Sequence, residues 1–305
     1  MNKSFTLIEI LVVIVVIGIL SAFILVGMSS ITSSANIAKV RAFINSMDNA
    51  LLLGRVSQWK FDEISGTMNN DSWQSNTGSI VGYTVTTAGH GDNNTYGWMS
   101  SSNCVSGTCL KFDGINNYVN CGSGTNLQFG TGDFTISFWR KRIAAYKNYA
   151  GIVGSSASSE GYVGFYEGLN GEYFEMGNGA IYQSFNITNL RAGSVMNTFQ
   201  HIVIVVDRDG KMDTYLDGIK KDSITITLST SLSIGFSTLY IGNFWAGRFN
   251  GIVDDVRIYN QAIPTSEIQQ NYFLGLNNLY KNKGITLNEF NQRIVELKSN
   301  LANND

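Results

Sequence analysis

His201-Ile-Val-Ile-Val-Val-Asp207 is the stretch that decides the fold of the larger part of this chain. The residues inside it are all apolar and β-branched, which suits a strand that is buried on both faces. Such a strand lies in the middle of a β-sandwich, where two sheets pack face to face. Phe134-Thr-Ile-Ser-Phe-Trp-Arg140 alternates apolar and other residues, so its apolar side chains share one face. The two runs together predict a β-sandwich.

The composition of the 305 residues supports an all-β domain. The chain has 32 Gly and 1 Pro, and Gly, Asn, Ser and Thr separate its short apolar runs, a pattern typical of strands joined by turns. Charged residues make up 14% of the chain, the net charge is −2, and no basic patch stands out. Nucleic acid is therefore excluded as a partner. The length leaves room for one long helix and either one large domain or two small ones.

The N-terminal segment differs, because Glu9 is its only charged residue between Phe5 and Ile37. The apolar run from Phe5 to Met28 is long enough to cross a bilayer as a helix at about 1.5 Å per residue. Lys3 lies just outside this run and favours a cytoplasmic N-terminus. A carboxylate inside a spanning segment costs on the order of a few kcal/mol, so Glu9 is a candidate functional residue.

Lys3-Ser-Phe-Thr-Leu-Ile-Glu9 and the apolar residues after it resemble the N-terminus of type IV pilins and of the pseudopilins of type II secretion. The resemblance implies that a prepilin peptidase cuts between Ser4 and Phe5 and methylates the new amino group of Phe5. It also implies that Glu9 pairs with the N-terminal amine of a neighbouring subunit during assembly, which would neutralise a buried carboxylate. Ser4 is a departure, since the family usually has Gly before the cut.

Two other interpretations of this segment stay open, an ordinary signal peptide and a plain membrane anchor. A signal peptide has a shorter apolar core and a small-residue cleavage site after it, for which Ser21-Ala22 is a poor match. Neither explains a carboxylate at position 9. Apolar residues continue at helical spacing from Ile31 to Leu52, so the sequence predicts one long helix from Phe5 to about residue 55.

Five segments beyond this helix resemble the successive landmarks of laminin G-like, or concanavalin A-like, jelly-roll domains. They are WKFDEISG (59–66), CLKFDGINNYVNC (109–121), GDFTISFWRK (132–141), FQHIVIVVDRDGKMDTYLDG (199–218) and FNGIVDDVRIYNQAI (249–263). The resemblance implies a jelly roll of two antiparallel sheets. Residues 110–114 and 118–121 are predicted to form a hairpin. The fold hosts lectins, adhesion modules and glycan hydrolases, so it implies no single function.

The chain has three cysteines, and two of them flank a tight Val-Ser-Gly-Thr turn. Cys104 and Cys109 are therefore predicted to form a disulfide outside the cytosol. Cys121 is left over and is predicted to be a buried free thiol. Beside a two-cysteine loop, and with only two histidines in the chain, a zinc site is disfavoured.

Ile252-Val-Asp-Asp-Val-Arg-Ile258 contains a candidate metal ligand, because Asp254 shares a strand face with apolar residues. A carboxylate in that position needs hydrogen-bond donors or a cation. The jelly-roll resemblance implies a structural calcium ion, held by the last-strand Asp, backbone carbonyls of the first strand and an early loop. Asp254 is the first candidate ligand, and Asp62, Glu63 and Asp113 are further ones. The alternative is that Asp254 caps backbone amides at a sheet end.

No catalytic arrangement is recognisable, so the sequence predicts that the protein is not an enzyme. Glycan hydrolases of this fold use two carboxylates on one strand face, whereas Glu172 and Glu175 are spaced so that they lie on opposite faces. His201 is predicted to be a packed core residue. His90 is predicted to lie exposed in a Gly-Asp-Asn loop.

Exposed aromatic rings in loops can stack on sugar rings, although most aromatic residues pack in a core. Five aromatic residues lie in or near Gly- and Asn-rich loops and are candidates for ligand binding: Trp73, Trp98, Tyr166, Tyr173 and Trp245. None of them is singled out by the sequence alone.

The C-terminal segment is predicted to be helical. Pro264 stands just before a short helix that starts at Thr265 and runs to Tyr272, and Thr286-Leu-Asn-Glu289 has the form of a capping box ahead of a second helix. The run 276–298 resembles short C-terminal helical hairpins of many bacterial proteins. We expect it to dock on the domain or on a neighbouring subunit, or else to be a mobile tail.

Together these features predict an α+β chain. It consists of a leader (1–4), a pilin-like helix (5–55, transmembrane over 5–28), a concanavalin A-like jelly roll (56–272) and a C-terminal helical hairpin or tail (273–305). The favoured function is that of a minor pilin or pseudopilin in a type IV pilus or a type II secretion-like filament, displaying a lectin-like domain for adhesion. The alternatives are a membrane-anchored carbohydrate-binding surface protein and a glycan hydrolase.

The same features predict the partners and the location. The partners would be other pilin or pseudopilin subunits, prepilin peptidase and a carbohydrate or surface-protein ligand, with one structural calcium ion as cofactor. The chain would lie in the bacterial inner membrane before assembly and at the cell surface, in an extracellular filament, afterwards.

Overall fold

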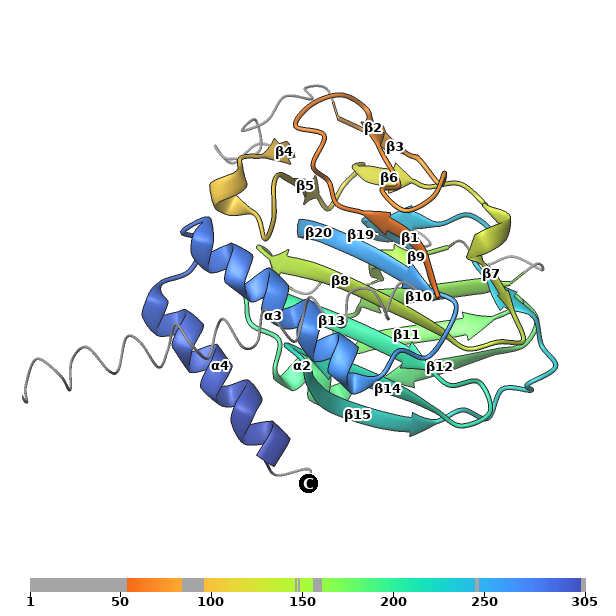
Figure 1. The fold of residues 1–305 in the computed structure, drawn as a ribbon. Helices are drawn as coiled ribbons and strands as arrows, with labels where there is room; N and C mark the ends of the chain where they lie inside the picture. The colour runs from red at the N-terminus through yellow and green to blue at the C-terminus, as the bar shows by residue number, and fades with distance from the viewer. Residues whose placement is uncertain are drawn as a thin grey trace, which may run out of the picture. The chain divides into compact units, whose positions relative to one another are not determined.

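The computed structural model describes residues 54–83, 96–145, 147, 149–155, 161–244 and 247–302. They belong to a compact unit that runs from Gly54 to Asp305. Two β-sheets pack face to face, and two C-terminal helices cover one of them (Figure 1). The predicted sandwich is therefore confirmed. The predicted N-terminal helix lies outside the described residues, and none of the helices in the described ranges combines the length and apolar character that crossing a membrane requires.

Within these ranges the first sheet has eight strands. Their order is β15 (Ile219–Thr225), β14 (Lys211–Leu216), β13 (Phe199–Val206), β8 (Phe134–Arg142), β20 (Asn250–Tyr259), β5 (Cys109–Asp113) and β4 (Gly97–Met99), and β1 (Arg55–Trp59) also pairs with β20.

The second sheet has ten strands in the same part of the chain. Their order is β12 (Tyr182–Asn186), β11 (Glu172–Gly177), β10 (Tyr162–Glu167), β9 (Ala150–Gly154), β17 (Tyr240–Ile241), β6 (Tyr118–Asn120), β3 (Gly78–Val81) and β2 (Met68–Asn69), joined by β18 (Asn243–Phe244) and β19 (Gly247–Arg248). A separate pair is formed by β7 (Gln128–Gly130) and β16 (Ile234–Gly235).

The core between the sheets follows the alternation seen in the sequence. Phe134 and Phe138 of β8 point inward and are fully buried. Phe138 meets Phe165 of the second sheet with ring centroids 5.4 Å apart, and Phe134 meets Phe174 at 6.4 Å. Burying one such ring contributes roughly 1.5–3 kcal/mol, so this interface holds the two sheets together.

The strand β13 is apolar on both faces because both faces are covered. Ile202 and Ile204 lie in the core between the sheets, whereas Val203 and Val205 pack with Ile268 of α3 (Thr265–Lys281) on the other side. The pattern that predicted a central strand is thus explained by a second layer, a helix that crosses the outer face of the first sheet.

α3 approaches the first sheet closely at one point. The ring of Tyr272 stacks on that of Trp139 of β8 at 5.7 Å. A Cβ atom on Gly275, one turn further along, would lie 2.3 Å from the Trp139 ring. The helix was predicted to end at Tyr272, but it continues to Lys281, because the next turns also bury apolar residues such as Leu276 against the sheet.

The second helix, α4 (Leu287–Ala302), packs on α3. Phe290 contacts Tyr280 with ring centroids 5.3 Å apart, and Arg293 donates a hydrogen bond to the carbonyl oxygen of Phe199 in β13 at 2.9 Å. The hydroxyl of Thr286 accepts the amide of Glu289, as a capping box requires. The C-terminal segment therefore docks on the domain and is no mobile tail.

One predicted hairpin is wrong. β5 and β6, which cover the segments 110–114 and 118–121, belong to different sheets. Oδ1 of Asp113 accepts the amides of Ile115, Asn116 and Asn117, and Gly114 adopts a left-handed φ of 69°. This side-chain-capped turn carries the chain across the sandwich instead of back along the same sheet.

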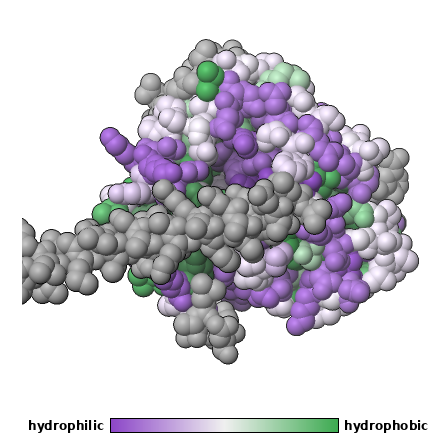
Figure 2. Space-filling view, in the orientation of Figure 1, coloured by the Kyte–Doolittle hydropathy of each residue, from purple (hydrophilic) through white to green (hydrophobic). Residues whose placement is uncertain are grey.

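The helix-covered side of the domain is shown in space-filling form in Figure 2. The described surface visible there is largely hydrophilic, with apolar side chains in scattered spots. The apolar residues of α3 pack against those of the first sheet. The outer face of the second sheet has no such helix in the described ranges, and a candidate binding surface is sought there.

Candidate functional site

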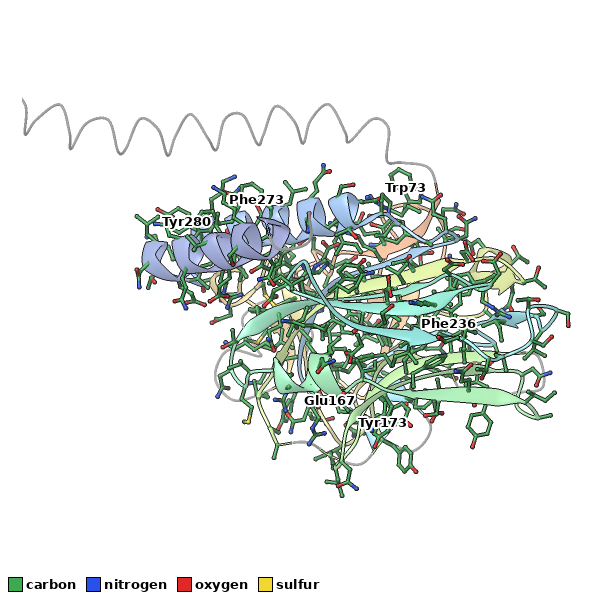
Figure 3. All side chains as sticks on the ribbon, turned by 90° about the horizontal axis from the view of Figure 1, so that it is seen from below. Trp73, Glu167, Tyr173, Phe236, Phe273 and Tyr280 are labelled. Carbon is green, nitrogen blue, oxygen red and sulfur yellow. A yellow bond between two sulfur atoms is a disulfide. The ribbon has the colours of Figure 1, made fainter. Side chains whose placement is uncertain are left out.

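The outer side of the second sheet carries a row of tyrosines. Phe165 of β10 and Phe174 of β11 point into the core, so their neighbours Tyr166 and Tyr173 point outward. We call this surface the tyrosine face; its residues are Tyr118, Tyr162, Tyr166, Tyr173, Glu175, Tyr182, Tyr240, Phe244 and Arg248. Figure 3 shows Tyr173 on the side of the molecule opposite Phe273 and Tyr280 of the helices.

Three glycines make room for Phe244 on this face, Gly154 and Gly164 for its ring and Gly151 for its Cβ atom and backbone. A Cβ atom on Gly151 or Gly164 would lie 2.1 Å from Phe244, and one on Gly154 would lie 2.8 Å from it. Without side chains at these positions the ring lies directly against the backbone of β9 and β10. The glycines therefore create a flat base on which the next aromatic rings are ordered.

The rings of Phe244, Tyr166 and Tyr173 follow one another across neighbouring strands. Tyr166 stacks on Phe244 at 5.0 Å and on Tyr173 at 5.3 Å, with interplanar angles of 11° and 16°. Phe244 and Tyr166 are buried, whereas Tyr173 is half-buried. Tyr149, which is 47% exposed, lies 5.6 Å from Tyr166 at the border of the row. The row thus offers a ligand the outer rings, held in place by the inner ones.

Polar groups accompany the aromatic row. The hydroxyl of Tyr166 donates to Oε1 of Glu175 at 2.6 Å. Burial and this hydrogen bond raise the pKa of Tyr166 far above its ordinary value, so the hydroxyl keeps its proton. Tyr182, whose ring lies 6.4 Å from that of Tyr162, is 59% exposed. Rings for stacking and fixed hydrogen-bonding groups stand side by side here, which is the combination that sugar recognition needs.

The other end of the face is built around Arg248. Its guanidinium carbon lies 4.9 Å from the ring centroid of Tyr118, and Tyr240 meets the same ring edge-on at 5.7 Å. Nη1 of Arg248 donates to Oδ1 of Asn243, which fixes the plane of the guanidinium. This end therefore presents a positioned cation next to two half-buried tyrosines.

The structure brings two of the five aromatic candidates, Tyr166 and Tyr173, onto this face. Trp98 is buried and donates to the carbonyl of Gly66 at 3.0 Å, so it is a core residue. Trp73 is 37% exposed but lies elsewhere, against Arg55. Trp245 lies outside the described residues. The other tyrosines of the face were missed, although their alternation with core residues such as Val119 was a usable signal.

A buried ionic cluster inside the sandwich was also missed. Arg140 of β8 donates to Glu167 at 2.7 Å and to Glu172 at 2.6 Å, and all three side chains are at most 4% exposed. Burial raises the pKa of Glu167 above its ordinary value. Glu172 thus points inward while Glu175 points outward, as the spacing predicted. The carboxylate of Glu172 is paired with Arg140 and closed off from solvent, so its role is structural.

The predicted disulfide is present between Cys104 and Cys109. The disulfide closes a short loop that contains Val105 and Ser106. Oδ2 of Asp254 accepts hydrogen bonds from the amides of these two residues, at 2.8 and 3.1 Å. Asp254 thus caps backbone amides, the alternative that the sequence left open. Its Oδ1 atom has no hydrogen-bond partner in the described ranges, and burial raises the pKa of Asp254 well above its ordinary value. Cys121 is a buried free thiol, as predicted.

Of the other proposed calcium ligands, one lies close to Asp254 and the others have different partners. Asp62 accepts the amide of Thr108 in the same disulfide loop and therefore lies close to Asp254. Asp113 pairs with Asn250, four residues from Asp254 along β20, or about 13 Å away at ~3.3 Å per residue. Glu63 accepts the amide of Asn70. No group of three or more His, Cys, Asp or Glu side chains with metal-binding geometry occurs in the described ranges.

His201 is a packed residue, as predicted. It is 2% exposed, and its Nε2 lies 2.8 Å from the hydroxyl of Ser137. Its ring lies 5.1 Å from that of Trp139 and 6.3 Å from that of Tyr272. Burial lowers its pKa to about 3, so it stays neutral. His90, together with Ser4, Phe5 and Glu9 of the processing and assembly motif, lies outside the described residues.

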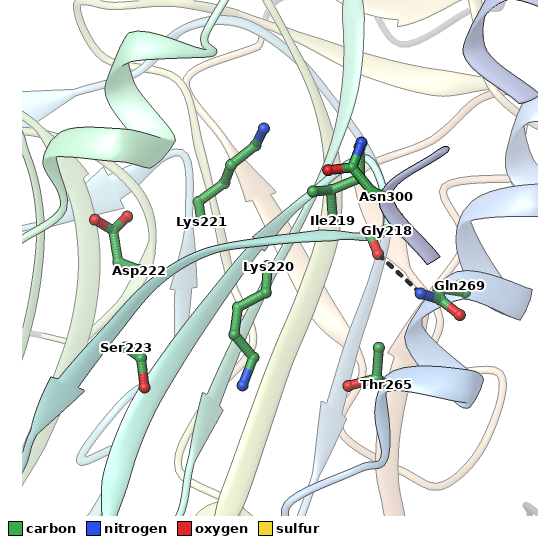
Figure 4. A pocket seen from close by; sticks show the side chains of 9 residues that line it. All are labelled: Gly218, Ile219, Lys220, Lys221, Asp222, Ser223, Thr265, Gln269 and Asn300. Carbon is green, nitrogen blue, oxygen red and sulfur yellow. Dashed lines mark hydrogen bonds between the residues drawn. The ribbon is translucent and has the colours of Figure 1, made fainter. Parts of the chain in front are cut away.

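A polar cavity of about 530 Å³ lies between β15 and the two C-terminal helices (Figure 4). Lys220 and Lys221 of β15, Gln269 of α3 and Asn300 of α4 line it, and Gln269 donates to the carbonyl of Gly218 at 3.5 Å. The described residues that line it include no aromatic ring and no grouped carboxylates, so the tyrosine face remains the stronger site.

Two family models match the sequence. The model described as concanavalin A-like lectin/glucanases superfamily matches residues 113–269, just over half of the chain. The model of the prokaryotic N-terminal methylation motif matches residues 1–25. No curated protein matches the chain.

Solved structures share the fold of the described domain. Domain 4 of AbnA, an extracellular arabinanase from Geobacillus stearothermophilus in complex with arabinotriose, is 16% identical, with a TM-score of 0.54 over 71% of this chain and 97% of that one. The botulinum neurotoxin serotype D binding domain is 14% identical, with a TM-score of 0.55 over 75% of this chain and 52% of that one. The binding domain of Paraclostridial Mosquitocidal Protein 1 is 15% identical, with a TM-score of 0.53 over 73% and 53%. This chain spans about half of the toxin domains, and the likeness concerns the fold.

Proposed function

Because this chain belongs to the concanavalin A-like lectin/glucanase superfamily and begins with a prokaryotic N-terminal methylation motif, we propose that it is a pilin-like subunit displaying a glycan-binding domain at the cell surface. The N-terminal motif supports processing by a prepilin peptidase and assembly with other pilins. The sandwich supports a binding role, since the solved structures that resemble it include the binding domains of toxins.

The observation that carries the binding role is the tyrosine face. It combines stacked rings with Glu175 and Arg248 as hydrogen-bonding groups, and it lies away from the helices that cover the first sheet. A sugar ring would stack on an outer ring such as Tyr173, while its hydroxyl groups bond to the polar residues. Glycan recognition on the displayed domain would make the subunit an adhesive, minor or tip component of its filament.

The N-terminal segment would supply assembly. Cleavage between Ser4 and Phe5 leaves an amino group on Phe5, and the carboxylate of Glu9 would pair with the amine of a neighbouring subunit. An uncompensated carboxylate in an apolar bundle is costly, so this pairing would drive ordered packing. The chain would wait in the inner membrane until assembly moves it to the surface.

We also propose a structural calcium ion beside the disulfide loop. The buried Oδ1 of Asp254, which has no hydrogen-bond partner in the part of the chain that the structure describes, and the nearby carboxylate of Asp62 fit a hard cation, which prefers oxygen ligands. Asp113 does not fit the same ion, because its carboxylate serves the turn after β5. Asp254 and Asp62 would hold the loop 104–109 and β20 in place, a structural role.

The binding proposal is tested by screening the full-length chain, kept in detergent, against immobilised plant and bacterial polysaccharides. Tyr173→Ala is expected to weaken glycan binding about tenfold, because it removes one stacking contact with a sugar ring and the hydrogen bond that the tyrosine hydroxyl would make to the glycan. Tyr280→Ala removes a tyrosine that is 37% exposed from the helix side and serves as the matched control. Equal losses in the two variants, or no glycan bound at all, would contradict the proposal.

The assembly proposal has its own test. Mass spectrometry of the N-terminal peptide from native cells is expected to show a chain that begins at methylated Phe5. A peptide that begins at Met1 or Asn2 would indicate a membrane-anchored surface protein without filament assembly, and one that begins after Ala22 a signal peptide.

A further inference from the structure

Arg248 is held in a single orientation on the tyrosine face. The Tyr118 ring lies below its guanidinium at 4.9 Å, and the carbonyl oxygen of the Asn243 side chain accepts from Nη1. Asn243 is 7% exposed, so this acceptor is itself fixed by burial. The guanidinium is therefore a rigid planar donor group at the surface, unlike the flexible cation of an exposed lysine.

No carboxylate in the described ranges matches the charge of Arg248. In the described ranges ion pairs form at Arg140, Arg142, Lys220, Arg257 and Arg293, and none forms at Arg248. Its Nε atom is buried and has no hydrogen-bond partner there. Nε itself is too deeply buried to contact a ligand, so an anion would meet the terminal nitrogens of the guanidinium. A partly desolvated cation favours such an anion, because the anion restores electrostatic interactions that burial removed.

We infer that the tyrosine face takes an anionic glycan with uronic acid residues, and that Arg248 binds the carboxylate of one of them. This inference rests on the proposed function and specifies its ligand class. The planar fork of a guanidinium matches a carboxylate geometrically. Tyr240, whose ring meets that of Tyr118 edge-on, provides a ring beside it for the sugar itself.

The remainder of the tyrosine face would accept the rest of the glycan. From β6, which carries Tyr118, to β12, which carries Tyr182, the sheet extends over five strand spacings of about 4.8 Å, roughly 24 Å. Glu175 on β11 accepts hydrogen bonds from hydroxyl groups and repels a second carboxylate. The two ends of the face thus differ in charge, which gives an extended glycan one preferred placement.

The test uses the full-length chain in detergent and three polymers: de-esterified polygalacturonate, its methyl-esterified form with the same backbone but no charge, and neutral arabinan. Wild type is expected to bind the de-esterified polymer at least about tenfold more tightly than the esterified one at low salt. Arg248→Gln is expected to abolish this preference while keeping the weaker binding of the esterified polymer. Lys281→Gln, which removes an exposed positive charge from α3, is the matched control and is expected to change nothing.

Arg248→Lys keeps the charge but loses the planar fork, and it is expected to lose most of the preference. If wild type binds the charged and esterified polymers equally, or binds arabinan alone, the inference is overturned while the proposed function stands. If Arg248→Gln or Arg248→Lys keeps the full preference, another group binds the carboxylate and the inference is likewise overturned. If no polymer binds, both the inference and the proposed glycan-binding role fail.

Discussion

Glu167 and Glu172 lie opposite each other across β10 and β11, and one guanidinium, that of Arg140, binds both carboxylates. Arg140 belongs to the first sheet and the two glutamates to the second, so this cluster joins the two layers through their interior. Nε of Arg142 adds a more distant contact, 3.8 Å from Glu167. The arrangement replaces apolar packing at one end of the sandwich with a network whose members depend on each other.

Arg140→Met is expected to destabilise the domain by about 3–5 kcal/mol, because it leaves two buried carboxylates without their cation. Urea denaturation followed by the fluorescence of the buried tryptophans measures the loss. Lys220→Met is the matched control, since the Lys220–Asp213 pair is exposed and its removal is expected to cost less than about 1 kcal/mol. Similar losses in the two variants would show that the cluster contributes no more than a surface pair.

Glu267→Gln tests a buried carboxyl in the first turn of α3. Burial raises the pKa of Glu267 from 4.5 to about 7, against the opposing effect of Arg55 and Arg257. The folded state therefore binds this proton more tightly than the unfolded state. The contribution of Glu267 to the free energy of unfolding is fully present below about pH 4.5 and is lost as the pH rises through about 7.

Glutamine cannot lose a proton, so Glu267→Gln is expected to match wild type at about pH 4 and to be more stable at about pH 8. Thermal unfolding of both proteins across this pH range measures the difference between their free energies of unfolding. The effects of the other titrating groups cancel in this difference, because both proteins contain them. A difference that is the same at both pH values would mean that Glu267 ionises normally in the folded domain.

The sandwich and its central strands were predictable, because alternation and β-branched runs reflect burial that is local in the sequence. Phe134 to Arg142 and Phe199 to Val206 are strands for this reason. The Cys104–Cys109 bridge and the packed His201 were predictable as well, the first from its spacing and the second from its apolar strand.

The tyrosine face was only partly predictable, since it depends on strand register. Phe244 meets Gly151 and Gly164 because β18, which is distant in sequence, comes to lie against the consecutive strands β9 and β10. Arg140 finds Glu167 and Glu172 in the same way, across the two sheets. A single sequence records the side chains but contains no direct sign of which strands pair, so such clusters emerge only with the fold.

Gly275→Ala tests the contact between α3 and the first sheet. In an isolated helix the change would stabilise the helical state by about 1 kcal/mol, because Ala has a higher helix propensity than Gly. Here the new methyl group would lie 2.3 Å from the Trp139 ring, so the helix would have to move off the sheet. We therefore expect a lower free energy of unfolding, by roughly 1–3 kcal/mol. Asn291→Ala on the exposed side of α4 is the control, and a stabilised Gly275→Ala protein would show that the helix shifts without cost.

Calcium addition tests the pairing of Asp254 with Asp62. With calcium at about 100 times its dissociation constant, a bound ion stabilises the folded state by about 2.7 kcal/mol, which corresponds to a rise of roughly 5–10 °C in Tm. Asp254→Asn is expected to lose this rise, because it removes the carboxylate whose Oδ1 atom has no partner among the described residues. Asp113→Asn is expected to keep it, since that carboxylate serves the turn after β5. A wild-type Tm that chelator and calcium leave unchanged would mean that Asp254 acts only as a cap for the amides of Val105 and Ser106.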